Sequence, residues 1–91
     1  MPSAQQDLID AQTWFNGRRA GLGEEFAVEV LDGLEQIGSR PELYGEVASG
    51  IRGAGVKRFG YVIYYRILPN LVEVLAILHG SRDSRGWQSR I

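Results

Sequence analysis

The chain has 91 residues, of which 44% are hydrophobic and 23% charged, and its formal net charge is −1. This length and balance predict one folded domain, residues 1–91, with a small core, and they exclude a disordered or fibrous chain. The absence of cysteine excludes disulfides and thiolate metal sites, and a single histidine argues against a histidine metal site, so we expect no metal and no cofactor. No apolar run reaches the roughly 18 residues of a membrane span, and no signal-peptide pattern opens the chain, which favours a cytoplasmic protein without membrane contact.

The charge is distributed unevenly along the chain. Residues 1–50 contain nine acidic and three basic residues, whereas residues 51–91 contain two acidic and seven basic residues. A basic C-terminal half could bind nucleic acid or an acidic protein segment, because charge gathered on one face attracts the opposite charge. The alternative is that the two halves neutralise each other across the fold.

Two amphipathic helices are predicted in the first half of the chain. The first spans about residues 4–15, because Ser3 and Gln6 form a capping-box pattern and apolar residues then recur at helical spacing. The second spans about residues 22–37, with an apolar face opposite an acidic one, and ends at Gly38. The short glycine-containing link between them favours an antiparallel hairpin.

A small sheet is predicted in the second half, at about residues 51–78. Residues 39–50 lack a period and are expected to form a connection, with one helical turn begun at Pro41. The apolar period then changes to two, which is typical of strands rich in β-branched and aromatic residues. The strands are predicted at 51–59, 61–68 and 71–78, with a tight hairpin at Pro69-Asn70. Since both faces of the middle strand are apolar, the helices should cover one face, and a tail of residues 79–91 or a partner should cover part of the other.

Three segments in this order resemble a known family: LGEEFAVEVLDGLEQIGSRPELYGEV, VKRFGYVIYYRI and VEVLAILHGSRDSRGW. Over about residues 7–88 the chain resembles the RelE/ParE superfamily of toxins from bacterial type II toxin–antitoxin systems, especially the ParE-like, plasmid-stabilisation branch. The resemblance implies an α+β fold, in which an antiparallel helical hairpin packs on a small antiparallel β-sheet, and a cognate antitoxin that wraps around the toxin.

One departure from the family is that its usual N-terminal strand is missing here, since only three residues precede the first helix. A missing strand would leave a sheet edge unpaired, so we expect either a homo-oligomer or a hetero-complex in which the antitoxin completes the sheet. The alternative is that the tail folds back over the gap, with Trp87 and Ile91 covering the apolar surface.

The resemblance implies growth inhibition by poisoning DNA gyrase, without chemistry of the toxin's own. The alternative is a RelE-type endoribonuclease that cuts messenger RNA on the ribosome, for which the family pattern places lysines and an arginine where this chain has Gly53, Gly55 and Val62. These side chains cannot transfer protons or stabilise a phosphorane. His79 and Arg82 are the catalytic candidates should the chain be a nuclease, although His79 could simply end the last strand. A third possibility is a degenerate toxin retained as an antitoxin-binding or dimerising module.

The remaining candidates are binding residues. Arg58, Arg66, Arg82, Arg85 and Trp87 are predicted to contact the antitoxin or the target, the arginines through charge-assisted hydrogen bonds to an acidic segment. We expect that segment to lie in the groove between the helices and the sheet. The alternatives are a solvated tail for the C-terminal arginines and a packing role for Trp87, which would pin the C-terminal turn onto the sheet.

Overall fold

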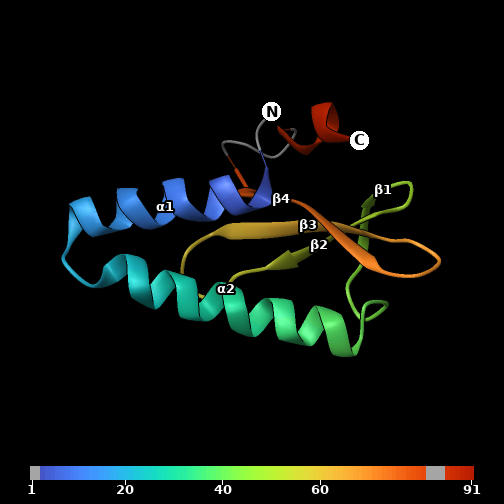
Figure 1. Cartoon of the computed structure of the whole chain (residues 1–91), viewed down its shortest axis with the longest axis horizontal. Helices are drawn as coiled ribbons and strands as arrows, with labels where there is room; N and C mark the ends of the chain where they lie inside the picture. Colours follow the sequence, from blue (N-terminus) through green and yellow to red (C-terminus); the bar gives the residue numbers. More distant parts are fainter. Residues whose placement is uncertain (1–2, 82–85) are drawn as a thin grey trace.

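The computed structural model describes residues 3–81 and 86–91. Its elements are α1 (Ala4–Arg18), α2 (Leu22–Ser39), β1 (Glu46–Ala48), β2 (Ile51–Gly55), β3 (Tyr61–Ile67), β4 (Val72–His79) and a short 3-10 helix, η1 (Gly86–Arg90). The strands form one antiparallel sheet in the order β1-β2-β3-β4, and the helical hairpin packs on one of its faces (Figure 1). The predicted α+β architecture is therefore confirmed, and no helix in the described part of the chain is both long and apolar enough to cross a membrane.

The helices begin where the sequence predicts and end slightly later. The Ser3 hydroxyl accepts a 3.1 Å hydrogen bond from the Gln6 N–H, which confirms the N-cap of α1. The helix continues to Arg18 rather than ending near residue 15, and α2 continues through Gly38 to Ser39. The three additional residues of α1 continue the helix through Asn16 and Gly17, and the last turn closes with the Arg19 N–H on the Phe15 carbonyl. The differences at both ends leave the predicted hairpin unchanged.

The predicted sheet needs two corrections. The strand predicted for residues 51–59 ends at Gly55, because the chain turns at residues 57–59, where Arg58 adopts a left-handed conformation with φ 75°. The connection predicted for residues 39–50 contains a fourth strand, β1, and its residues 41–44 form turns and bends instead of a helical turn. A two-residue link, in which Gly50 has φ 76°, joins β1 to β2 as a tight hairpin.

Side chains from the two faces of the sheet form separate hydrophobic clusters. The larger cluster joins the sheet to the helices, and its buried members are Ala11, Phe15, Phe26, Val30, Ile37, Ala54, Val56, Ile63, Tyr65 and Ile77. The smaller cluster lies on the opposite face, which we call the outer face, and consists of Ile51, Tyr64, Leu75, Ala76 and Trp87. The predicted alternation along the middle strand is thus confirmed, since Ile63 and Tyr65 face the helices while Tyr64 faces outward.

The C-terminal segment covers part of the outer face, as the tail alternative predicted. The Trp87 side chain is buried, with its ring centroid 6.0 Å from that of Tyr64. The expectation for Ile91 is wrong, because this residue is 60% exposed. Trp87 is therefore the packing anchor that fixes η1 on the sheet.

Candidate functional site

The outer face holds Gly53, Gly55 and Val62, the positions at which the RelE-type alternative expects basic residues. Gly53 of β2 is paired with Tyr64, and Gly55 is paired with Val62 of β3. A Cβ atom built on Gly53 would lie 3.0 Å from Val47 Cγ1 and 3.1 Å from Val62 Cγ1, so a side chain at this position would press on the β1 and β3 valines. Among residues 3–81 and 86–91, the side chains around Gly53 on this face are those of Val47, Val62 and Tyr64, none of which is an acid or a base at neutral pH.

His79 lies on the other face of the sheet. It is the register partner of Tyr61, and paired residues in an antiparallel ladder direct their side chains to the same face. Tyr61 packs against the helix-side cluster, and the two rings meet edge to face with centroids 5.5 Å apart. The His79 Nδ1 atom also contacts the Ser81 hydroxyl at 3.0 Å. The sheet therefore separates His79 from Gly53 and Val62, and Arg82, its proposed catalytic companion, lies outside the described residues.

The two described arginines among the binding candidates lie near opposite ends of β3. Arg58, in the turn before β3, donates a 2.9 Å hydrogen bond to Glu25 of α2, and this bond lowers the pKa of the Glu25 carboxyl below its ordinary 4.5. Arg66, near the C-terminal end of β3, donates a 2.6 Å hydrogen bond to Glu73 on the neighbouring strand. The structure thus does not bring the two arginines together, and each is engaged by a carboxylate of the same chain.

Of the remaining binding candidates, Arg85, like Arg82, falls outside the described residues. Trp87 is described, and only 6% of its surface is exposed. A side chain with so little free surface acts on binding mainly through the segment that it holds in place. The packing alternative for Trp87 is the one that the structure favours.

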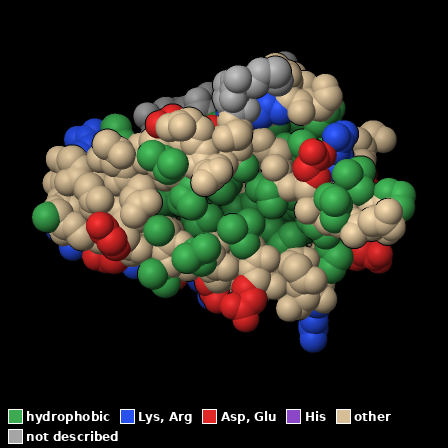
Figure 2. All heavy atoms as spheres, viewed as in Figure 1, with side chains coloured by type: hydrophobic (Ala, Val, Ile, Leu, Met, Phe, Trp, Pro, Cys, Tyr) green, Lys and Arg blue, Asp and Glu red, His purple; other side chains and the backbone are tan. Residues whose placement is uncertain are grey.

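The surface between the two helices is strongly apolar. Figure 2 shows hydrophobic side chains gathered between α1 and α2 and continuing toward the loops at the far end of the sheet. Partly buried side chains pack against the helix-side core from both helices, from the segments that precede β1 and β3, and from β3 and β4: Ala4, Leu8, Leu22, Leu34, Tyr44, Phe59, Tyr61, Val72 and Val74. On the β4 side, a pocket of about 380 Å³ opens between α1 and β4 and is lined by Asp7, Asp10, Ala11, Trp14, Tyr61, Ile77 and Leu78. An apolar surface of this kind is typical of a protein-binding site.

One constellation was missed by the sequence reasoning. Asp7 of α1 and Arg90 of η1 form a nearly buried ion pair that also hydrogen-bonds the backbone of β4. The sequence carries no signal for it, because an acid in the first turn of a helix is common and its partner is far away along the chain. Elsewhere in the described part, no group of three or more His, Asp or Glu side chains could hold a metal ion.

Comparison with known proteins identifies the family. The sequence model described as "ParE toxin of type II toxin-antitoxin system, parDE" matches residues 1–84, which is most of the chain. A search of curated proteins found no match.

Proposed function

Because the chain belongs to the ParE toxin family of type II toxin–antitoxin systems, we propose that a cognate antitoxin neutralises it and that the free toxin inhibits growth by binding DNA gyrase in the cytoplasm. In this proposal the toxin performs no bond-breaking step itself. It acts by occupying a surface of its target, so its function depends on shape and charge rather than on an acid–base pair.

The packing around Gly53 is the observation that supports a binding function over ribonuclease activity. Cleavage next to a 2′-hydroxyl requires a base, an acid and a cation that converge on one phosphate. Here Val47 and Val62 occupy the space around Gly53, and His79 points to the opposite face of the sheet. The described residues therefore offer no converging set of such groups at the nuclease positions.

Induced expression of the toxin separates the two activities. We expect growth arrest together with activation of a DNA-damage reporter, and purified toxin should make purified gyrase accumulate cleaved DNA. His79→Ala should retain both effects, because the proposed mechanism does not use the imidazole.

A second variant, Trp87→Ala, tests the C-terminal segment. It removes the anchor of η1 and should weaken both effects if the docked segment contributes to the target surface. Mapping of messenger RNA ends in the same cultures provides the opposing outcome. Cleavage within ribosome-bound messages that disappears in His79→Ala would overturn the proposal and support the endoribonuclease. Full growth with normal antitoxin binding would instead support a degenerate module.

The antitoxin in this proposal contributes an acidic segment that lies between the helices and the sheet. The apolar surface shown in Figure 2 supports this position, since it would bury the apolar side chains of such a segment. The seven basic residues within residues 51–91 supply the complementary charge. Arg58 and Arg66 are the described residues that we expect to bind the segment's carboxylates.

A further inference from the structure

Strand β4 is an edge of the sheet that is closed by side chains instead of a neighbouring strand. It pairs with β3 on one side, and within the described residues the strand order places no other strand beside it. In an edge strand, every second residue directs its backbone N–H and C=O groups away from the neighbouring strand. These groups can pair with another chain. Those of Ile77 and Leu75 point away from β3 and would be available for pairing if nothing covered them.

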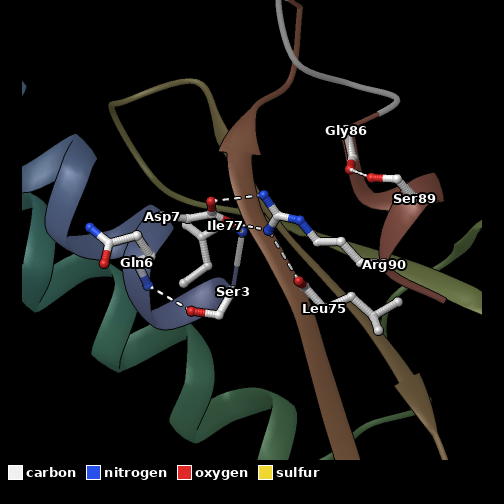
Figure 3. Close-up of polar contacts among 8 residues, drawn as sticks. All are labelled: Ser3, Gln6, Asp7, Leu75, Ile77, Gly86, Ser89 and Arg90. Atoms are coloured by element: carbon white, nitrogen blue, oxygen red, sulfur yellow. Dashed lines mark hydrogen bonds and ion pairs between the residues drawn. The ribbon is translucent and has the colours of Figure 1, made fainter. Parts of the chain in front are cut away.

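Asp7 and Arg90 bind both of these groups. The Ile77 N–H donates a 2.9 Å hydrogen bond to Asp7 Oδ2, and Arg90 Nη1 donates a 3.2 Å hydrogen bond to the Leu75 carbonyl (Figure 3). The two side chains also bind each other, through Arg90 Nη2 and Asp7 Oδ1 at 3.0 Å and through Nη1 and Oδ2. Together they supply one acceptor and one donor to β4, as an adjacent strand would.

The position of the arginine contact is explained by an irregularity in the ladder. Tyr64 is paired with Ala76 and Tyr65 with Val74, so Leu75 is an extra residue on β4. The extra residue of a β-bulge is left out of the regular pairing, and its carbonyl needs another donor. Arg90 provides that donor from outside the sheet.

Both side chains are held in place by their own elements. Asp7 lies in the first turn of α1, which the Ser3 cap fixes, and Arg90 ends the short helix that Trp87 anchors on the outer face. The side chains are only 8% and 10% exposed, respectively. Removing either side chain would leave the other as an uncompensated buried charge, which is strongly destabilising, so the two are expected to stay together.

We propose that the Asp7–Arg90 pair is a latch that closes the β4 edge to strand pairing and at the same time holds η1 on the sheet. The two roles are linked because an added strand needs the Ile77 N–H and the Leu75 carbonyl, which Asp7 and Arg90 occupy. Opening the latch releases η1 and exposes β4. The freed Ile77 N–H and Leu75 carbonyl flank Ala76, so two antiparallel copies of β4 related by a twofold axis at Ala76 can exchange these two hydrogen bonds, and the occupant of the opened edge is therefore β4 of a second copy of the chain. This device does not depend on the identity of the toxin's target.

Hydrogen exchange and sedimentation of purified protein test the latch. The wild-type chain should be monomeric over a wide concentration range, with slow exchange of the Ile77 amide and of residues 86–90. In Arg90→Ala, both regions should exchange at least tenfold faster at low concentration, and a dimer should form as the concentration rises. Formation of that dimer should slow exchange of the Ile77 amide again while residues 86–90 remain fast.

Two further variants keep the test decisive. Arg90→Lys retains the charge but lacks the forked donors that reach Asp7 and Leu75 together, so it should give an intermediate effect even if Arg90→Ala unfolds. Asp10→Asn is the matched control, since Asp10 lies on the same helix but accepts a 2.8 Å hydrogen bond from the exposed Gln6 side chain instead of binding β4, and it should behave as wild type. A wild-type dimer paired through β4, or folded Arg90 variants that remain monomeric with slow exchange of residues 86–90, would overturn the proposal.

Discussion

The Tyr65 side chain is fully buried, yet its hydroxyl donates a 2.6 Å hydrogen bond to the Pro41 carbonyl and so ties the segment after α2 to the sheet. We predict that Tyr65→Phe lowers the free energy of unfolding by roughly 1 kcal/mol, because the carbonyl loses its donor while the ring packing stays the same. Urea denaturation measures this difference. Tyr44→Phe is the control, since its hydroxyl bonds Gln36 at an exposed position and should contribute much less.

The same residue should make stability depend on alkaline pH. Burial raises the pKa of the Tyr65 hydroxyl above its ordinary 10.0. In the unfolded chain this hydroxyl ionises at the ordinary value, so the free energy of unfolding should fall as the pH rises above about 10. Urea denaturation at increasing pH should show a smaller decline in Tyr65→Phe than in the wild type, and parallel declines in the two proteins would contradict the prediction.

The junction of the two helices depends on a close approach at Gly23. Its N–H donates a 2.8 Å hydrogen bond to the Asn16 side chain, which caps α2 from the preceding helix. A Cβ atom on Gly23 would lie 2.3 Å from the Gln12 carbonyl oxygen, so we predict that Gly23→Ala lowers the free energy of unfolding by about 2–3 kcal/mol. Gly17→Ala is the control, because nothing lies within 4 Å of its added Cβ, and it should stabilise α1 by about 0.5–1 kcal/mol. Equal denaturation midpoints for the two variants would contradict this account.

At the level of elements, the sequence predicts long periodic segments well and short ones poorly. Both helices and the strands β3 and β4 were predicted because their apolar side chains repeat over many residues. Strand β1 spans only Glu46–Ala48, which is too short to show a period of two. The sequence feature that could have indicated β1 is the Ser49-Gly50 pair, since a glycine suited to positive φ often forms the turn between two short strands.

At the level of the whole molecule, the least predictable features are contacts between distant segments. The absence of acid–base residues at Gly53, Gly55 and Val62 could be seen in the sequence, but the packing of Val47 that fills the same space depends on the unpredicted strand β1. Asp7 and Arg90 meet across 83 positions, and no local pattern relates them. Within the described residues β4 is an edge strand, as the missing strand predicts, but Asp7 and Arg90 bind the Ile77 N–H and the Leu75 carbonyl, so these two groups are not open.

The charge on the whole molecule gives the last prediction, which concerns antitoxin binding. Arg58 and Arg66 lie near opposite ends of β3, a strand roughly 20 Å long, so each should contribute independently. We predict that Arg58→Ala and Arg66→Ala each weaken the affinity by up to about tenfold, reduce its salt dependence and combine additively. Glu25→Gln and Glu73→Gln are the reciprocal variants. They remove the internal carboxylate partners of Arg58 and Arg66 and should therefore strengthen antitoxin binding. Titration calorimetry at several salt concentrations distinguishes the cases, and unchanged affinity and salt dependence in all four variants would show that these arginines do not bind the antitoxin.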